Sequence, residues 1–304
     1  MDRSRLVLGT VQLGMKYGLN NTTGQPTKDE SFAILDAALE AGINTFDTAW
    51  AYGSAEDVLG EWIKKRSLAD NIFIVSKIKP HVLNDYPEEN DPSNIVRSEI
   101  GKSLKRLNLR SLDGYLLHSP QYLNNKGVLE GLMKVREAGL ANHIGVSIYD
   151  VADALAALEH GLDFVQVPYN VLDRRLEKTD FFAKTKERGV RVFARSPFLQ
   201  GLLLMEMGDI PARLAHARPL VLKFGEIARR HELTRVEAAL LFAYRCPADH
   251  IVFGVETLAQ LEEIISIKDR LESFGEKCVA ELRDAFTDVD RAIVNPSLWS
   301  TIQK

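Results

Sequence analysis

Four residues that could move protons stand at or just beyond the ends of consecutive apolar segments. Asp47 lies at the end of INTFDTA, Tyr52 follows five residues later, Lys77 lies near the end of IFIVSKI, and His118 closes LDGYLLH. A charged or polar residue at the end of an apolar strand does not stabilise the fold by itself, because an unpaired buried charge is costly. Taken singly, Asp47 could begin a turn, Lys77 could reach solvent, and His118 could be a hydrogen-bonded core residue.

Taken together, these residues suit proton delivery to a carbonyl oxygen. A phenol has an unperturbed pKa of about 10 and keeps its proton at neutral pH. A nearby ammonium stabilises the phenolate and is expected to lower that pKa, while a carboxylate holds the ammonium in place. Tyr52 is then the acid, Lys77 its modulator and Asp47 the anchor, with neutral His118 orienting the carbonyl. None of these side chains donates hydride, so a nicotinamide cofactor must supply it.

Eight short, nearly continuous apolar segments predict the strands of a parallel sheet buried on both faces. They occupy residues 5–10, 43–49, 72–78, 112–118, 143–148, 164–170, 190–196 and 251–256. Helical patterns lie between them at 27–42, 92–108, 127–139, 150–161, 176–188 and 234–245. The first and last of these begin with Thr and have Glu three residues later, the spacing of a capping box.

Eight strands alternating with helices, without a linker, predict a single (β/α)8 barrel domain over residues 1–304. A doubly wound sheet is the alternative, but the motifs GxGxxG and GxxxxGK are absent. Segments 11–26, 79–91 and 197–219 are long and follow strands, where a barrel builds its site. We expect a C-terminal helix and tail, about residues 276–304, to pack on or near the barrel mouth.

The composition is that of an ordinary globular enzyme and excludes several other classes. Of 304 residues 45% are hydrophobic and 26% charged, and the net charge of −4 comes without a basic stripe for nucleic acid. The sequence has no run of about 18 apolar residues, so no membrane span is predicted. The two cysteines and seven histidines show no metal-binding spacing. The start lacks an apolar signal segment, so we expect a cytoplasmic protein of unknown oligomeric state.

The ordered set of motifs resembles the aldo/keto reductase superfamily, in particular its bacterial members. The resemblance rests on FDTAWAYGSAEDVLG, VSK at 75–77, LLH at 116–118, GVS at 145–147, VQVPYN at 165–170 and SPFLQGLL at 196–203. It implies a (β/α)8 barrel without a metal that binds NAD(P)H in extended form, without a Rossmann fold. It also implies an Asp-Tyr-Lys-His tetrad at Asp47, Tyr52, Lys77 and His118.

The same matching implies which residues contact the cofactor and the substrate. Ser147 and Gln166 are expected to hold the carboxamide, and the loop from Ser196 to Gly201 to wrap the pyrophosphate. The full cofactor set is Thr10, Ser147, Gln166, Arg195, Ser196, Phe198, Gly201, Gly254, Gln260 and Glu263. Trp50 and Trp299 are candidate substrate contacts; the alternatives are a lid over the barrel rim for Trp50 and an anchor for the tail for Trp299.

Two residues near the expected carboxamide site depart from the family pattern. Ile148 stands where the family often has asparagine, which removes one carboxamide contact. Arg195 replaces the aromatic residue that usually stacks on the nicotinamide. A guanidinium also stacks on rings, but its charge would repel the oxidised, cationic nicotinamide and spare the reduced one. Arg195 therefore biases the site towards NAD(P)H, points at an anionic group of the substrate, or turns away to pair with a carboxylate.

A third departure concerns the choice between NADPH and NADH. Gly254, Val255 and Gln260 stand where many NADPH-specific members have basic residues for the 2′-phosphate. Glu256 nearby would disfavour a phosphate dianion. The sequence thus favours NADH or dual use, against the family's usual preference for NADPH, although a basic residue elsewhere, such as Lys268, could compensate.

The resulting expectation is an NAD(P)H-dependent reductase of an aldehyde or ketone, with a polar or sugar-like carbonyl compound as the candidate substrate. No nucleic-acid or membrane partner is expected. Two alternatives use the same barrel. One is a cofactor-binding sensor or accessory protein with little turnover. The other is a metal-dependent hydrolase or isomerase, which the missing ligand spacings disfavour.

Overall fold

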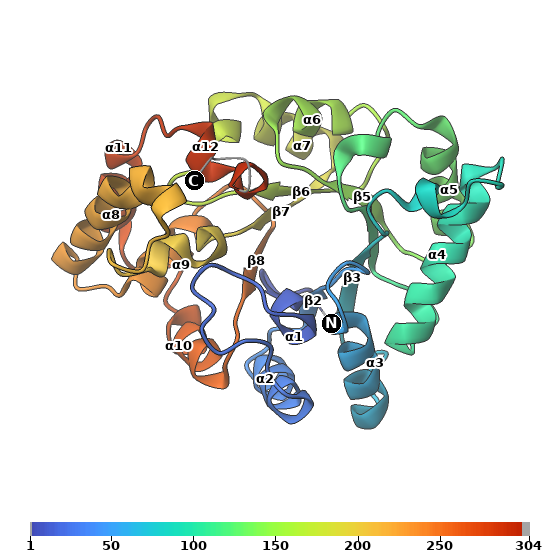
Figure 1. Cartoon of the computed structure of the whole chain (residues 1–304), viewed down its shortest axis with the longest axis horizontal. Coiled ribbons are helices and arrows are strands. Elements are labelled where there is room, and N and C mark those ends of the chain that lie inside the picture. The colour runs from blue at the N-terminus through green and yellow to red at the C-terminus, as the bar shows by residue number, and fades with distance from the viewer. Residues whose placement is uncertain (1, 300–304) are drawn as a thin grey trace.

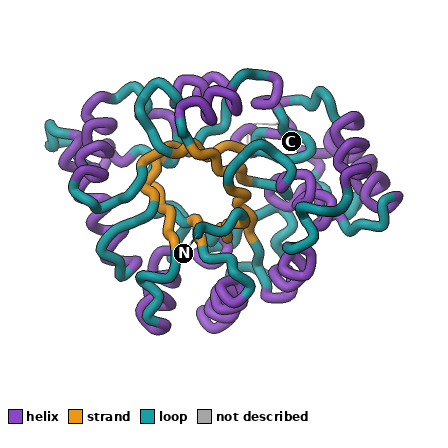
Figure 2. The backbone as a smooth tube through the Cα atoms, turned by 180° about the vertical axis from the view of Figure 1, so that it is seen from behind, coloured by secondary structure: helices purple, strands orange, loops and turns teal. Residues whose placement is uncertain are grey.

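Eight parallel strands close into a barrel in sequence order, surrounded by helices (Figure 1). The computed structural model describes residues 2–299. All eight predicted strands are confirmed, and the view from behind shows them as a ring enclosed by helices (Figure 2). The strands are β1 (Leu6–Gly9), β2 (Thr45–Asp47), β3 (Phe73–Lys77), β4 (Gly114–Leu117), β5 (Ile144–Ser147), β6 (Phe164–Pro168), β7 (Arg191–Arg195) and β8 (His250–Gly254).

Helices follow the strands as a (β/α)8 barrel requires, with additional short helices in the loops. The α-helices are α1 (Val11–Gly14), α2 (Lys28–Glu40), α3 (Ala55–Arg66), α4 (Pro92–Leu107), α5 (Lys126–Glu137), α6 (Val151–Ala157), α7 (Phe181–Arg188), α8 (Arg218–Arg230), α9 (Arg235–Tyr244), α10 (Leu258–Lys268), α11 (Glu276–Ala285) and α12 (Arg291–Val294). The 3-10 helices are η1 (Val82–Asp85), η2 (Pro120–Tyr122), η3 (Arg175–Lys178), η4 (Leu199–Leu204), η5 (Ala212–Ala217) and η6 (Pro296–Leu298).

The prediction of one continuous helix over residues 176–188 was wrong. The chain forms the short helix η3, leaves the helical conformation at Thr179, and begins α7 at Phe181. Thr179 has extended backbone angles, with φ −127° and ψ 176°, and its hydroxyl oxygen accepts a hydrogen bond from the Phe181 amide. A threonine that binds the backbone locally in this way competes with helix continuation.

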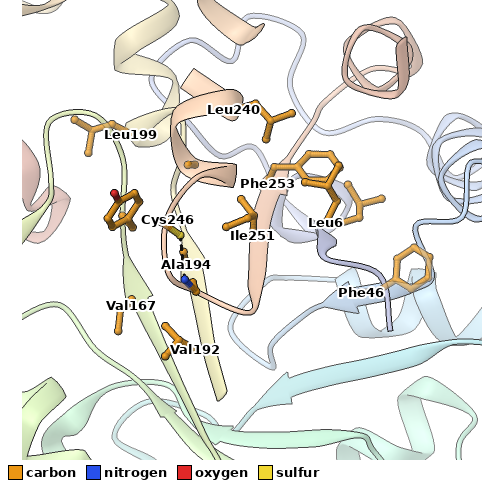
Figure 3. Packing of buried hydrophobic residues seen from close by; sticks show 14 of the residues in the cluster. Leu6, Phe46, Val167, Val192, Ala194, Leu199, Leu240, Cys246, Ile251 and Phe253 are labelled. Carbon is orange, nitrogen blue, oxygen red and sulfur yellow. Dashed lines mark hydrogen bonds between the residues drawn. The ribbon is translucent and has the colours of Figure 1, made fainter. Parts of the chain in front are cut away.

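Alternation along the strands divides the apolar core into two clusters. Leu6 and Leu8 of β1 point outward into the large cluster between strands and helices, part of which Figure 3 shows. Val7 between them points inward, because successive side chains of a strand face opposite sides. The inner cluster fills the barrel with Val7, Val75, Leu116, Phe164, Phe193 and Val252.

The inward-facing positions at the carboxyl ends of the strands carry the residues of the predicted site. Each lies two residues after a member of the inner cluster, and therefore on the same face of the sheet. These residues are Lys77, His118, Gln166, Arg195 and Gly254. The apolar layer thus forms the floor on which polar side chains gather at one end of the barrel.

The described part of the C-terminal segment packs against the outer helices and the loop after β5. Helix α11 contacts α8 and α9, and Arg291 forms an ion pair with Asp150 at 2.7 Å. Trp299 is buried, and its indole N–H donates to the Ile293 carbonyl at 3.0 Å. Residues 300–304 of the predicted tail lie outside the described residues. Within residues 2–299 no helix has the length and apolar character needed to cross a membrane.

Both sequence-predicted capping boxes are present and generate a stability prediction. The Thr27 hydroxyl accepts from the Glu30 amide, and the Glu30 carboxylate accepts from the Thr27 amide at 2.8 Å. Thr27→Ala leaves helix donors unpaired and should lower the free energy of unfolding by about 1 kcal/mol. Urea denaturation measures it, with Thr23→Ala, an exposed threonine outside the helix, as control. An equal loss in both variants would contradict the capping contribution.

Candidate active site

A buried ion pair between the ends of β2 and β3 forms the base of the candidate site. The Lys77 ammonium donates to the Asp47 carboxylate oxygens at 2.8 and 2.7 Å, to the Thr48 carbonyl at 3.0 Å, and to the Tyr52 hydroxyl at 3.2 Å. Lys77 is fully buried. Burial lowers the pKa of Lys77, whereas the Asp47 carboxylate raises it. The ammonium thus links the carboxylate to the phenol, as the sequence predicts.

Residues on β6 and just after β1 also hold Asp47. The Gln166 amide on β6 donates to the Asp47 carboxylate at 2.8 Å. Thr10, just after β1, donates its amide and its hydroxyl to the Asp47 carbonyl, at 2.9 and 3.1 Å. Thr10 is fully buried, does not line the cavity described below and supports the end of β2; its expected cofactor contact stays a prediction.

A tight turn after β2 places Tyr52 over the ion pair. Its amide donates to the Ala49 carbonyl at 3.1 Å, and the next residue, Gly53, has φ +58°. A side chain at Gly53 would come within 2.3 Å of the Gly14 carbonyl, so helix α1 can pack against this turn only because Gly53 lacks one. The Tyr52 ring meets the His118 ring edge-on, with centroids 5.6 Å apart.

The structure does not give the expected lowering of the Tyr52 pKa. Burial raises the pKa of the Tyr52 phenol well above its usual value, and the Asp47 carboxylate raises it further, while the Arg195 guanidinium opposes both. Burial is the largest cause because it disfavours the charged phenolate, and Asp47 offsets part of the positive charge of Lys77 that would stabilise it. Tyr52 therefore keeps its proton across the physiological pH range, which suits a proton donor.

His118 is a neutral imidazole at physiological pH. Burial lowers its pKa to about 3, and the positive charges of Lys77 and Arg195 contribute to the lowering. Its Nδ1 atom is buried and has no hydrogen-bond partner within residues 2–299. A neutral imidazole with an unused ring nitrogen can make a hydrogen bond to a ligand without a charge of its own.

The tetrad opens into a cavity of about 500 Å³ that extends to helix α10. Most of the predicted residues line it: Asp47, Tyr52, His118, Ser147, Arg195, Ser196, Phe198, Gly201, Gly254, Gln260 and Glu263. Lys77 and Gln166 do not line the cavity, but both donate hydrogen bonds to Asp47, which does line the cavity.

The two tryptophans expected to contact substrate do not line this cavity. Trp50 lies partly exposed beyond β2, where the Lys79 ammonium lies 4.7 Å from the centre of its ring. Trp299 is buried against its own C-terminal segment. Substrate contacts from these two residues stay predictions, and the burial and hydrogen bond of Trp299 are those of an anchor for the described part of the tail.

The cavity fits the carboxamide of a nicotinamide at the ends of β5 and β6. Gln166 commits its Nε2 atom to Asp47, and its Oε1 atom is buried without a partner among the described residues. This orphaned acceptor suits an amide N–H, and the neighbouring Ser147 hydroxyl suits the amide oxygen. Ser147 and Gln166 are directly opposite each other in the β5–β6 register.

The loop after β7 has an unusual backbone that could receive a phosphate-bearing segment. Ser196, Leu199 and Gln200 have positive φ angles of 63°, 48° and 54°, a conformation that non-glycine residues adopt at a cost. Successive backbone N–H groups in such conformations form concave sites for anions. The loop is covered by the segment after α1, because the Leu19 amide donates to the Gln200 carbonyl at 2.8 Å.

Several lining residues were not recognised from the sequence. They include Gln12 and Tyr17 from the long segment after β1, and Tyr149 after β5. The length of segment 11–26 was the available signal for the first two. Nothing in the local sequence indicated Tyr149, which reaches the cavity only because β5 ends two residues earlier.

No group of three or more His, Cys, Asp or Glu side chains within residues 2–299 is arranged to hold a metal ion.

Comparison with known proteins gives a family model that matches nearly the whole chain and relatives that match a smaller part of it. The model of the aldo/keto reductase family matches residues 5–283. Aldo-keto reductase str7 of Strobilurus tenacellus is 28% identical over 259 residues, covering 77% of this chain and 75% of that protein. D-threo-aldose 1-dehydrogenase of Pseudomonas sp is 28% identical over 276 residues, covering 77% and 82%. NADH-specific methylglyoxal reductase of Escherichia coli (strain K12) is 29% identical over 219 residues, covering 66% and 65%.

The low pKa of His118 predicts a pH-dependent contribution to stability. An unfolded imidazole titrates near 6.5, so the unfolded chain binds this proton first as pH falls, and stability is lost between about pH 6.5 and 3. Between pH 7 and pH 5 the parent protein should lose about 2 kcal/mol more of its unfolding free energy than His118→Gln. Denaturant titrations at both pH values measure the difference. Equal losses would show that His118 is not a buried neutral group.

Proposed function

The chain belongs to the aldo/keto reductase family, and from that membership we propose that it reduces an aldehyde or ketone to the alcohol, with Tyr52 as the proton donor. The observation that carries the proposal is the Lys77 ammonium, which bonds both to Asp47 and, at 3.2 Å, to the Tyr52 hydroxyl. NAD(P)H, when bound, supplies the hydride that adds to the carbonyl carbon.

The side chains of the tetrad divide the remaining work. Tyr52 gives its proton to the carbonyl oxygen as negative charge develops there. Lys77, already bonded to the phenol oxygen, stabilises the phenolate that remains, and Asp47 keeps the ammonium in position. His118 donates a hydrogen bond to the same carbonyl oxygen without competing as an acid, because its low pKa keeps it neutral.

A small polar carbonyl compound is the substrate class that we infer. In addition to the tetrad, the cavity lining includes the phenols of Tyr17 and Tyr149 and the amides of Gln12 and Gln200, which support this inference. Two of the relatives bear names that refer to an aldose and to methylglyoxal, both small and polar. The proposal for this chain is therefore a polar, sugar-like or short-chain aldehyde or ketone.

A sensor or accessory protein that binds the cofactor without turnover is the second reading of the same fold. The complete tetrad, in which Lys77 bonds to both Asp47 and Tyr52, favours the enzyme, because a site that only binds a dinucleotide needs no buried ammonium on a phenol. A single-turnover test with bound NAD(P)H and a panel of simple aldehydes separates the two. Oxidation of the bound cofactor supports the reductase, and tight binding without oxidation supports the sensor.

We propose NADH rather than NADPH as the preferred cofactor. The α10 end of the cavity is acidic: Glu256 and Glu263 line it, and Arg195 at the opposite end is the sole Lys or Arg among its described lining residues. Glu256 is partly buried, and Gln260 holds it through bonds to its amide and carboxylate. A carboxylate can accept from a ribose 2′-hydroxyl, whereas it repels a 2′-phosphate.

Replacement of the proton donor tests the reaction. Tyr52→Phe should lower kcat by at least about a hundredfold, because general-acid catalysis contributes that much or more, while NADH binding stays within about twofold. Steady-state rates and NADH fluorescence titration measure the two effects. Tyr86→Phe removes a phenol outside the cavity and serves as control. Retained turnover in Tyr52→Phe would refute the assignment.

Neutralising the acidic end of the cavity tests the cofactor preference. Glu256→Gln should improve binding of NADPH by about tenfold relative to NADH, because it removes the repulsion of the 2′-phosphate. Glu262, an exposed residue on α10 outside the cavity, provides the control Glu262→Gln. The measurement is the ratio of the two dissociation constants. A parent protein that binds NADPH more tightly than NADH would contradict the proposal.

A further inference from the structure

Arg195 is fixed across the ends of three strands at the tetrad end of the cavity. From the end of β7, its guanidinium donates to the Ile148 carbonyl just after β5 at 3.0 Å and to the Ser196 hydroxyl at 3.3 Å. The guanidinium carbon lies 4.2 Å from the centre of the Tyr149 ring. A planar guanidinium held by a carbonyl and a ring has a defined position, unlike a solvated surface arginine.

The positive charge of Arg195 has no anionic partner within residues 2–299. Its described contacts are neutral: the Ile148 carbonyl, the Ser196 hydroxyl and the Tyr149 ring. Its Nε atom is buried without an acceptor among these residues. The other cation at this end of the barrel, Lys77, is paired with Asp47. The expected alternative of an arginine turned away towards a carboxylate is therefore wrong.

The nicotinamide site proposed above adjoins this charge. Ser147, at the end of β5, and Gln166, on β6, are the two residues that suit the carboxamide. Ile148, whose carbonyl accepts a hydrogen bond from Arg195, directly follows Ser147 in the chain. The tetrad lies on the other side, at the ends of β2 to β4. A nicotinamide held by Ser147 and Gln166 would therefore lie near the Arg195 guanidinium.

We propose that Arg195 discriminates between the two redox states of the cofactor, weakening the binding of the oxidised, cationic nicotinamide relative to the reduced, neutral one. The inference rests on the proposed function. The carbonyl carbon would gain a hydride supplied by the reduced cofactor, which would be left in its oxidised, cationic form, and Tyr52 would give its proton to the carbonyl oxygen. Like charges a few ångströms apart in a partly buried site differ from a neutral contact by about tenfold or more in affinity.

The same charge acts on the tetrad. Arg195 opposes the rise in the Tyr52 pKa and contributes to the lowered pKa of His118. These effects show that the guanidinium lies within electrostatic range of the groups that would face the ring. They also indicate that the residue favours loss of the Tyr52 proton, the direction required for carbonyl reduction.

Equilibrium binding to charge variants of Arg195 tests the inference. Arg195→Gln and Arg195→Met remove the charge, Arg195→Lys keeps it, and Arg213→Gln removes an exposed charge outside the cavity as control. NADH is titrated by its fluorescence, and NAD⁺ by its displacement of NADH, at constant ionic strength. The ratio of the dissociation constant of NAD⁺ to that of NADH should fall by about tenfold in both neutral variants. It should stay near the parent value in Arg195→Lys and Arg213→Gln.

Each other outcome rejects the inference. An unchanged ratio in both neutral variants overturns it. An unchanged ratio together with a raised KM for carboxylate-bearing carbonyl substrates, but not for neutral ones, would assign Arg195 to an anionic group of the substrate instead. Failure of the parent protein to bind either NADH or NAD⁺ would overturn the proposed function and this inference together. The first two results leave the proposed function intact.

Discussion

The buried ion pair between Asp47 and Lys77 is the interaction on which the candidate site depends. Removing two charges from water costs several kcal/mol per ion, and only close pairing with further hydrogen bonds offsets that cost. Here the Gln166 amide and the Thr48 carbonyl supply those bonds, and Thr10 fixes the backbone of Asp47. Four strands therefore contribute to one salt bridge, and Tyr52 takes its position from the ammonium that the bridge holds.

The barrel can accommodate these buried charges because it separates apolar and polar layers along its axis. Inward side chains of the lower layer, such as Val75 and Phe164, fill the interior, and the inward side chains two residues later, Lys77 and Gln166, meet above them. The parallel register brings the carboxyl ends of all eight strands to one rim. A one-residue change of register would turn each polar side chain into the outer hydrophobic layer, so the site and the core constrain each other.

Features set by a local pattern or by the order of the strands were predictable from the sequence, and features set by the combined effect of several elements were not. Strand periodicity and the Thr27 capping box are local and were found, as was the association of Asp47 with Lys77 through their place in consecutive strands. The direction of the Tyr52 pKa was missed because it is a balance between burial, Asp47 and Arg195, which come from different elements. The burial of Trp299 likewise depends on a fold of the C-terminal segment that its polar sequence does not reveal.

The two departures from the family pattern near the carboxamide site are parts of one arrangement. Ile148 buries its side chain and offers only its carbonyl, and that carbonyl is the acceptor that fixes Arg195. Lys77 is compensated by Asp47, whereas Arg195 has no carboxylate partner within residues 2–299, so this end of the cavity carries a net positive charge. During reduction Arg195 would attract the phenolate left on Tyr52 while repelling the oxidised ring, and the two effects partly cancel. Once Tyr52 regains a proton only the repulsion remains, so Arg195 would act chiefly on release of the oxidised cofactor.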